Sequence, residues 1–320
     1  MSKYPQIDLH QIKRYSISDR HSKVNKELLG QSYSVGHSFK SFFKTLPDIL
    51  VAKDLKEFVE HVAQAIVKKK PVMLMMGAHS IKVGLSPMLI DLIREGIITS
   101  ISMNGAGVIH DTELALFGQT SEDVAKALAD GSFGMVQETG MLVNRFIIEA
   151  HESGLGLGEG VGKAILEKSR DNLQRSVLAN AYVHNVPATI HVAVGTDIIH
   201  QHPEADGAAL GATSHRDFKI FAAHAASLNE GGIVMNVGSN VILPEVFLKA
   251  LTVARNTKPP VNNFYTANFD MIQHYRPRVN VVQRPTLQGG KGYTFIGHHE
   301  IMLPLFFAAV KERLAELRSS

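Results

Sequence analysis

Cysteine is absent from the 320 residues of this chain, and its absence removes a whole set of chemistries. No thiolate can act as a nucleophile, no disulfide can form, and no zinc ion or iron–sulfur cluster can be held by cysteine ligands. A chain without disulfides has no need of an oxidising compartment. We therefore expect a cytoplasmic protein.

Long hydrophobic runs are also missing. The longest nearly uninterrupted apolar stretch, Ile301 to Val310, is about half the length that a bilayer-spanning helix needs. The first residues, MSKYPQIDLHQIKRYS, lack the hydrophobic core of a secretory signal. We expect neither a transmembrane span nor a secretory leader, and no membrane partner.

The chain also lacks a large excess of either positive or negative charge. The 33 Lys and Arg residues against 30 Asp and Glu residues leave a net charge of +3, and the basic residues are spread along the chain. A nucleic-acid-binding surface needs basic residues gathered in a patch or stripe, so no nucleic-acid partner is expected. With 45% hydrophobic residues, the chain is able to bury the core of a large domain.

Helix and strand patterns alternate after an initial polar segment. Residues 1–45 are polar without a sustained period, which predicts an N-terminal arm followed by one domain over 46–320. Asp54–Lys68 carries one apolar stripe and precedes an apolar run from Pro71, which predicts a helix and then a buried strand. Further strands are predicted at 97–103, 187–194, 233–237 and 261–267. This alternation favours a doubly wound α/β fold, with a mostly parallel sheet covered on both faces.

Three serines are predicted to cap helices. Ser86 precedes a proline, Ser121 precedes an apolar stripe, and Ser214 stands three residues before Asp217 as in a capping box. Gly96 is expected to end the first of these helices in a left-handed conformation.

Five loops after predicted strands are small and polar, and they are the candidate functional segments. In a doubly wound sheet, ligands bind at the carboxyl ends of strands, where small residues let the backbone approach a phosphate. Each loop alone could be an ordinary turn, but five in one chain favour a nucleotide site. The five segments are 77–84, 104–111, 195–197, 238–240 and 266–270.

The glycine-rich segment from Gly154 to Lys163 fits neither phosphate-binding fingerprint. Leu157 stands where the first glycine of a P-loop is needed, and Ala164 stands where a hydroxyl is needed. The segment also follows a helical pattern instead of a strand. We expect a flexible helix–helix connection or a lid.

The chain has 16 histidines, some of them close to carboxylates. His191 lies within an apolar strand and is expected to be a core residue. A second group contains side chains that can bind a divalent metal, but its spacing matches no ligand motif, and we expect no metal there. This group comprises His200, His202, Glu204, Asp206 and His215.

Several segments, in order, resemble those of the deoxyhypusine synthase family. Residues 84–111, GLSPMLIDLIREGIITSISMNGAGVIHD, resemble a helix and strand that end in T-A-G-G-V-E-E-D in that family. Residues 137–140, QETG, resemble R-E-N-G, and residues 230–241 resemble a strand followed by a G-G-G-V loop. TANFD at 266–270 resembles T-A-Q-E-F-D. The resemblance covers most of residues 70–310 and rests on the order and spacing of these motifs.

The resemblance implies a Rossmann-like sheet that binds NAD at the strand ends, in homotetramers with sites between subunits. Family members oxidise spermidine with NAD and transfer the aminobutyl group, through an imine on a lysine, to an acceptor amine. The implied cofactor-binding positions are Ala78, His79, Asn104, Gly105, Ala106, Asp197, Gly238, Ser239, Asn240, Thr266 and Ala267.

The polyamine half of the family's site differs in this chain. The sequence has no tryptophan, so the W-G-K segment with the imine-forming lysine is missing. Lys291 is the only lysine between the F-D motif and the final helix. Ile109 and His110 replace the two glutamates of E-E-D, and Pro244 replaces a histidine. Authentic deoxyhypusine synthesis is therefore not expected.

Three functions remain open. The first is an NAD-dependent transferase or oxidoreductase that acts by hydride transfer on an amine, such as a polyamine, or on another small substrate. Its catalytic candidates are Lys291 as an imine-forming amine, His110 as an acid or base, and Asp111 and Asp270 as orienting or cation-binding carboxylates. The second is an NAD-binding oligomer with a sensor or structural role. The third is a metal-assisted hydrolase.

Overall fold

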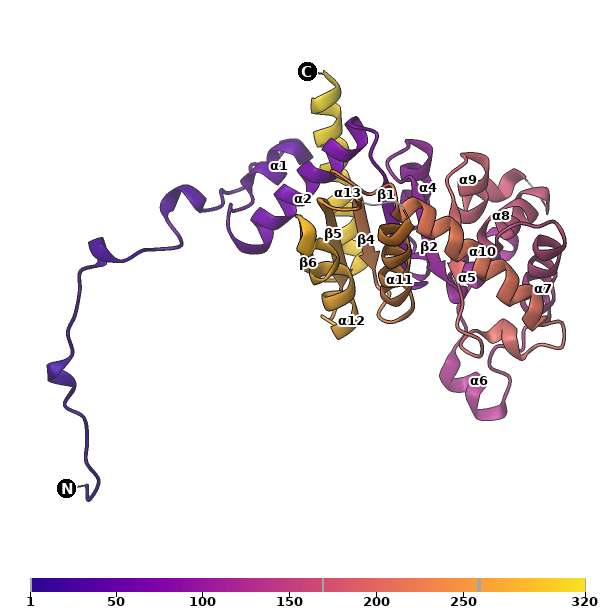
Figure 1. Cartoon of the computed structure of the whole chain (residues 1–320), viewed down its shortest axis with the longest axis horizontal. Helices are drawn as coiled ribbons and strands as arrows, with labels where there is room; N and C mark the ends of the chain where they lie inside the picture. The colour runs from indigo at the N-terminus through magenta and orange to yellow at the C-terminus, as the bar shows by residue number, and fades with distance from the viewer. Residues whose placement is uncertain (1, 169, 258–259, 320) are drawn as a thin grey trace. The chain divides into compact units, whose positions relative to one another are not determined.

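The computed structural model describes residues 2–168, 170–257 and 260–319, and the chain divides into two compact units between Lys53 and Asp54. Apart from the half-buried Leu28, every residue from 2 to 38 of the first unit is exposed. Side chains of Asp8, Ser16 and Asn25 cap its single-turn 3-10 helices. The elements of this unit are η1 (Leu9–Gln11), η2 (Ile17–Asp19), η3 (Lys26–Leu28) and α1 (Phe39–Thr45) (Figure 1).

Six parallel strands form the sheet of the second unit. Their order is β3-β2-β1-β4-β5-β6, and every neighbouring pair is parallel. This arrangement confirms the predicted doubly wound, Rossmann-like α/β fold. The chain passes from β1 to β2 on one side and later to β4 on the other, so the strand order reverses between β1 and β4. The strands are β1 (Val72–Met76), β2 (Ser100–Asn104), β3 (Ala188–His191), β4 (Ile233–Val237), β5 (Phe264–Asp270) and β6 (Gly290–Ile296).

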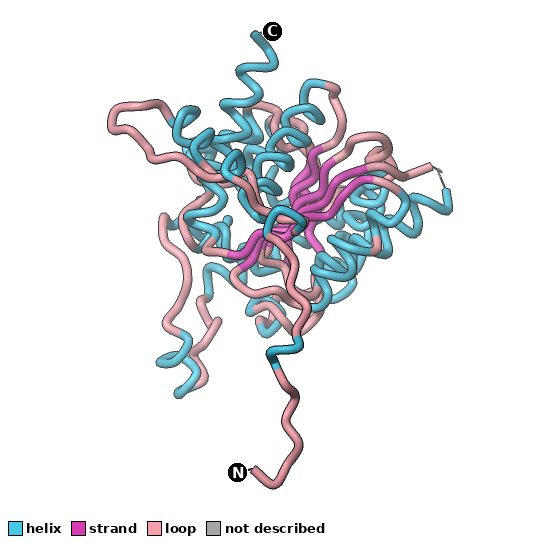
Figure 2. The backbone as a smooth tube through the Cα atoms, turned by 90° about the vertical axis from the view of Figure 1, so that its left-hand side faces the viewer, coloured by secondary structure: helices cyan, strands magenta, loops and turns pink. Residues whose placement is uncertain are grey.

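Helices lie on both sides of this sheet, as Figure 2 shows. None of those in the described ranges has the length and apolar content that a membrane crossing requires. The α-helices are α2 (Leu50–Val67), α3 (His79–Lys82), α4 (Ser86–Arg94), α5 (Gly105–Phe117), α6 (Val124–Asp130), α7 (Gln137–Glu152), α8 (Leu157–Lys168), α9 (Val177–Val183), α10 (Gly207–Ala225), α11 (Ile242–Thr257), α12 (Tyr275–Pro277) and α13 (His299–Ser319). Shorter 3-10 and π segments are η4 (Arg170–Gln174), η5 (Ile198–Gln201), η6 (Arg278–Gln283) and η7 (Pro285–Gln288).

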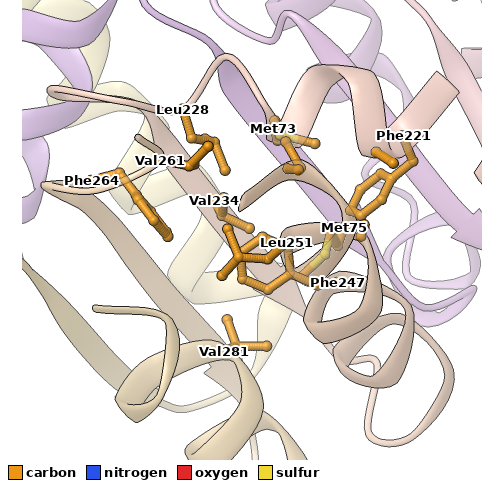
Figure 3. Close-up of a cluster of buried hydrophobic side chains, with 14 of the residues drawn as sticks. Met73, Met75, Phe221, Leu228, Val234, Phe247, Leu251, Val261, Phe264 and Val281 are labelled. Carbon is orange, nitrogen blue, oxygen red and sulfur yellow. The ribbon is translucent and has the colours of Figure 1, made fainter. Parts of the chain in front are cut away.

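One face of the sheet packs against α10 and α11. Met73 and Met75 of β1 form a buried cluster with Val234 of β4, Phe221 of α10 and Phe247 of α11 (Figure 3). Each of these side chains is at most 1% exposed. Full burial of a side chain of this size stabilises the fold by roughly 1.5–3 kcal/mol. The apolar residues at alternate positions of the strands therefore hold α10 and α11 on the sheet.

The other face carries an aromatic cluster around Phe58 of α2. The ring of Phe58 lies 5.1 Å from that of Tyr293 in β6 and 5.4 Å from that of Phe306 in α13, between centroids. Phe269 of β5 and Phe295 of β6 complete the cluster. Such offset and tilted ring pairs add about 0.5–1.5 kcal/mol each beyond the buried area. They fix α2 and α13 against β5 and β6.

The predicted helix caps are wrong, and α4 begins at Ser86 itself, with Leu85 at the cap position. The Ser86 side chain makes no cap hydrogen bond. Asp206 caps α10 by accepting two backbone N–H groups, so Ser214 lies inside that helix. Asp123, not Ser121, caps α6. Carboxylates two residues or more upstream reach the free N–H groups of the first turn, where they also face the positive end of the helix dipole.

The glycine-rich segment is not a flexible connection, because α8 covers most of it. Gly154 follows α7 with a positive φ of 70°. A Cβ on Gly158 would lie 2.2 Å from the carbonyl oxygen of Ala188, and one on Gly162 would lie 2.5 Å from that of Leu178. The glycines therefore let α8 pack closely against β3 and α9. Close packing of the helix backbone explains the composition without a phosphate or a lid.

Asp217 is a buried residue of α10 beside the edge strand β3. One of its carboxyl oxygens accepts the N–H groups of Ile190, at 2.7 Å, and Gly158, at 3.0 Å. The other has no partner among the described residues. Burial raises the pKa of Asp217 to about 7, although its hydrogen bonds oppose this rise. The folded protein therefore keeps a proton that the unfolded chain loses near pH 4, and the stability that Asp217 contributes falls as the pH rises toward 7.

We predict that Asp217→Asn removes this pH dependence. The amide keeps an oxygen for the two backbone N–H groups but cannot ionise. Relative to the wild type, the variant should gain on the order of 2–4 kcal/mol of unfolding free energy between pH 4.5 and 7.5. Urea unfolding at both pH values measures this difference. The exposed change Glu204→Gln is the control, and parallel behaviour of Asp217→Asn and wild type would refute the assignment.

Candidate functional site

The carboxyl ends of the central strands meet along one edge of the sheet. Met76, Val237 and Phe269 are register partners in β1, β4 and β5. The ladder continues past the strands, since the N–H of Gly77 donates to Val237 at 2.9 Å and that of Gly238 donates to Phe269 at 3.0 Å. We name the last residue of each strand, together with the segment that follows it, the carboxyl edge. In an open α/β sheet, this edge is where ligands bind, next to the reversal of strand order.

Glycine directly follows four of the six strands, at Gly77, Gly105, Gly238 and Gly297. A Cβ on Gly77 would lie 2.5 Å from the carbonyl oxygen of Gly238. A Cβ on Gly105 would lie 2.0 Å from a carboxylate oxygen of Asp197. Gly238 also has a positive φ of 63°, which other residues adopt at a cost. The glycines therefore bring the loops of neighbouring strands closer together than larger residues would.

In the described part of the chain, six of the fourteen buried side-chain polar atoms without a hydrogen-bond partner lie at the carboxyl edge. The last residues of β2 and β5 contribute one each, and the segments after β3, β4 and β6 contribute the others. Such an atom costs about 1–3 kcal/mol, and native proteins contain few of them. Six such atoms along one edge favour a ligand that supplies the missing partners. The atoms are Asn104 Oδ1, Asp197 Oδ2, His200 Nε2, Asn240 Oδ1, Asp270 Oδ2 and His299 Nδ1.

Asp197 and His200 face each other in the loop after β3. The N–H of Gly195 donates to His200 Nδ1 at 3.0 Å, so the proton of the neutral ring is on Nε2. That nitrogen lies 4.0 Å from Asp197 Oδ2, which is too far for a hydrogen bond. Burial raises the pKa of Asp197, while His200 and the N–H of Ala106 oppose the rise. A ligand hydroxyl between the two side chains could donate to Asp197 and accept from His200.

His299, the first residue of α13, is packed against the ends of β4 and β5. Its Nε2 lies 3.1 Å from the carbonyl oxygen of Phe269, which can only accept, so Nε2 carries the hydrogen and Nδ1 is bare. The ring contacts His79, with centroids 5.7 Å apart, and stands where a Cβ of Gly238 would be. Burial lowers the pKa of His299. The residue therefore offers a neutral acceptor at the reversal point.

Most of the predicted cofactor positions lie at this edge. Thr266 and Ala267 do not, because 266–270 is the second half of β5 and not a loop. Polar side chains inside a buried strand explain the error. Asp270 ends the strand, accepts the N–H of Met271 at 2.7 Å and leaves its second oxygen without a partner among the described residues. The positions at the edge are Ala78, His79, Asn104, Gly105, Ala106, Asp197, Gly238, Ser239 and Asn240.

Lys291 lies at the opposite end of the sheet from the carboxyl edge. It is the second residue of β6, and its Nζ lies 2.6 Å from Glu57 and 2.9 Å from Asp54 of α2. Burial opposes the charge, but the hydrogen bonds to both carboxylates outweigh it and raise the pKa of Lys291. An imine-forming amine must lose its proton, so this environment favours the opposite state.

Asp111 is buried within α5 and is hydrogen-bonded to the start of α9. The sequence predicts a loop over 104–111, but α5 begins at Gly105, and Asp111 is a fully buried residue of that helix. Its carboxylate accepts the Ser176 hydroxyl at 2.6 Å and the N–H of Val177 at 2.7 Å, at the start of α9. Burial raises the pKa of Asp111 to about 6, against the effect of these bonds. The side chain therefore joins α5 to α9.

His110, the next residue back along α5, belongs to a chain of hydrogen bonds. Its Nδ1 lies 2.6 Å from the hydroxyl of Thr120, and that hydroxyl lies 2.5 Å from Glu113 Oε2. Thr139 of α7 donates to the other oxygen of Glu113 at 2.8 Å. Burial lowers the pKa of His110, Lys82 lowers it further, and Glu113 opposes both. Sequence reasoning identified His110 but missed Glu113 and the two threonines.

A cavity of about 400 Å³ adjoins this chain of hydrogen bonds, between α5, the segment after it and the start of α7. Three of its lining residues are glutamates, and none is a lysine or an arginine. A cavity with this lining favours a positively charged small molecule. The lining residues are Glu113, Phe117, Gln119, Thr120, Ser121, Glu122, Val136, Glu138 and Thr139.

The alternative metal site does not form. No group of three or more histidine or carboxylate side chains in the described ranges is arranged to hold a metal ion. His202 is bonded to the carbonyl of Gly134 at 2.7 Å, Asp206 caps α10, and His215 is stacked on Phe218. The sequence places these residues close together, but separate local contacts direct them apart.

Comparison with known proteins shows the fold. No family model and no curated protein matches the chain. A "putative deoxyhypusine synthase" from Entamoeba histolytica is similar with a TM-score of 0.53 at 9% identity, over 88% of this chain and 95% of that one. Unliganded AgrE is similar with a TM-score of 0.51 at 15% identity, over 82% of this chain and 32% of its own. AgrE in complex with ornithine and NAD+ gives 0.50 at 14% identity, over 83% and 33%. This chain thus spans about a third of the length of AgrE.

Proposed function

We propose that this chain binds NAD at the carboxyl edge and catalyses reversible hydride transfer with an amine or another small substrate. One observation carries the proposal: the carboxyl ends of five strands carry buried polar atoms without partners, along the edge of the sheet that contains the reversal of strand order. The comparisons support the choice of cofactor. AgrE, which shares the fold, has been crystallised with NAD+, and the deoxyhypusine synthase family uses NAD.

The groups at the carboxyl edge match the chemistry of a dinucleotide. Asp197 and His200 form a donor–acceptor pair at a separation that a ribose hydroxyl would bridge. The free amide oxygens of Asn104 and Asn240 can accept from adenine or carboxamide N–H groups. The small residues from Gly238 let the backbone approach a phosphate. Bound NAD would supply a hydride acceptor.

The substrate end of the proposed site uses the residues of the cavity. Glu113 and Glu138 line the cavity and supply negative charge for an ammonium group. His110 is not itself a lining residue, but it is linked to Glu113 through the Thr120 hydroxyl and can act there as an acid or a base. Lys291 has no part in this chemistry, since it is held as a charged ion pair at the opposite end of its strand. We therefore favour an oxidoreductase over an aminobutyl transferase.

Asn240→Ala separates a ligand-binding role from a structural one. Because the Asn240 amide oxygen is buried without a partner, its removal should not lower the unfolding free energy and should raise it by up to about 1–3 kcal/mol. The affinity for NAD should fall by roughly 5-fold to 10-fold, as expected for one lost hydrogen bond. Calorimetric titration with NAD, together with thermal unfolding, measures both quantities.

The matched control is Ser100→Ala at the amino end of β2, because the Ser100 hydroxyl is also buried without a partner but lies far from the carboxyl edge along its strand. It should leave NAD affinity unchanged. If neither NAD nor NADH binds the wild type, the proposal is wrong. Tight binding of NAD with no formation of NADH from putrescine, spermidine or other amines would instead favour the second alternative, an NAD-binding protein without enzymatic activity.

We also propose that the chain forms homo-oligomers, such as the tetramers that the family resemblance implies. The first unit carries large apolar side chains that are mostly exposed to solvent, including Ile7 at 87% exposure, Ile17 at 74% and Val35 at 96%. Ordering such a segment costs about 1–2 kcal/mol per residue, and none of its described residues is buried in return. A surface of a second copy would cover these side chains.

The oligomer proposal predicts that Ile7→Ser combined with Ile17→Ser lowers the molar mass in solution. Light scattering after size exclusion measures the mass of the wild type and of the variant. The exposed polar pair Ser18→Ala and Ser22→Ala is the control, and it should keep the wild-type mass. A monomeric wild type would contradict the proposal.

A further inference from the structure

The single hydrogen of the Thr120 hydroxyl decides the direction of the hydrogen-bond chain beside the cavity. A carboxylate can only accept, so Thr120 donates to Glu113 Oε2, at 2.5 Å. The Thr120 oxygen is then left to accept from His110 Nδ1, at 2.6 Å. In the neutral ring, Nδ1 therefore carries the hydrogen, and Nε2 keeps a bare lone pair.

Two hydroxyl groups hold the Glu113 carboxylate, one from each side of α6 along the chain. Thr120 precedes α6 and Thr139 follows it, and the two threonines bind different oxygens of the same carboxylate. Thr139 is 2% exposed, so its hydroxyl does not exchange freely with water. The carboxylate is thus oriented before any ligand arrives, which is the arrangement that a positioned acid or base needs.

We propose that Glu113 and Thr120 are positioning residues that hold His110 in the Nδ1–H form, so that Nε2 accepts the substrate proton during hydride transfer. This inference rests on the proposed function. The substrate is a protonated amine with a hydrogen on the neighbouring carbon. One N–H proton passes to Nε2, and the freed electron pair forms a C=N bond. The C–H bond breaks at the same time, and its electron pair leaves with the hydride to NAD+. The products are an iminium ion, NADH and the imidazolium form of His110.

Two charged groups act on His110 from the elements around it. Glu113 lies on its own helix, α5, and Lys82 lies on α3. Lys82 disfavours the imidazolium, and Glu113 favours it. Before the reaction the ring is neutral and able to accept a proton. After the reaction, the relay through Thr120 brings the negative charge of Glu113 close to the imidazolium.

The test is the ring tautomer of His110, measured by nitrogen-15 NMR on the ligand-free protein with labelled histidine. His110→Gln identifies the signal. The wild type should show the Nδ1–H form, and Thr120→Ser should keep it because the hydroxyl is retained. Thr120→Val keeps the shape of threonine but removes the hydroxyl, and it should shift the ring toward the Nε2–H form. Thr252→Val, an exposed threonine on α11, is the matched control and should have no effect.

A second readout follows the proton itself. With NAD and an oxidisable amine, Thr120→Val should slow hydride transfer by roughly 10-fold to 100-fold and change its pH profile, and Thr120→Ser should restore both. A wild-type ring in the Nε2–H form, or a Thr120→Val protein that keeps the Nδ1–H form, would overturn the inference. Because the tautomer is read without NAD, this failure differs from a failure of NAD to bind.

Discussion

The register of the parallel strands is the constraint on which the rest of the molecule depends. Because β1, β4 and β5 end at the same level, the loops that follow them are forced together. Glycine at Gly77 and Gly238 lets the ladder of hydrogen bonds run one residue beyond the strands. Polar side chains in these loops are then buried against one another with atoms left unpaired. The same packing that stabilises the sheet thus creates a set of donors and acceptors for a ligand.

Helix α5 connects this edge to the chemistry proposed for the substrate. It begins at Gly105 beside Asp197, continues through His110 and Asp111, and reaches the cavity at Glu113. Asp111 joins the helix to α9 from its buried side, while His110 and Glu113 meet the hydrogen-bond chain on the other side. A rigid helix therefore sets the distance between cofactor groups and substrate groups. Nothing comparable among the described residues links Lys291 to the edge, because it lies at the other end of β6.

The sheet could be predicted from sequence because a parallel strand buried on both faces is a continuous apolar run. Residues 233–237 match β4 at both ends, and β1, β2 and β4 each end directly before a glycine of a predicted loop, although the segment after β2 is helix α5 and not a loop. Roles set by distant partners could not be predicted. Lys291 pairs with Asp54, 237 positions away, and Asp111 pairs with Ser176, 65 positions away. Local sequence patterns carry no information about such distant contacts. For the same reason, the polar residues in the second half of β5 were predicted to form a loop, although they lie in a buried strand.

The central claim is that an adenine dinucleotide satisfies the unpaired atoms of the carboxyl edge. The most direct measurement is a crystal structure of the protein grown with NAD. The account predicts density for the dinucleotide across the loops after β1 and β4, with a ribose hydroxyl between Asp197 and His200 and a polar atom of the ligand on Asn240. Density for the dinucleotide elsewhere on the molecule would contradict the account. A crystal grown with saturating NAD that shows only ordered water on each of these atoms, and no dinucleotide, would also contradict it.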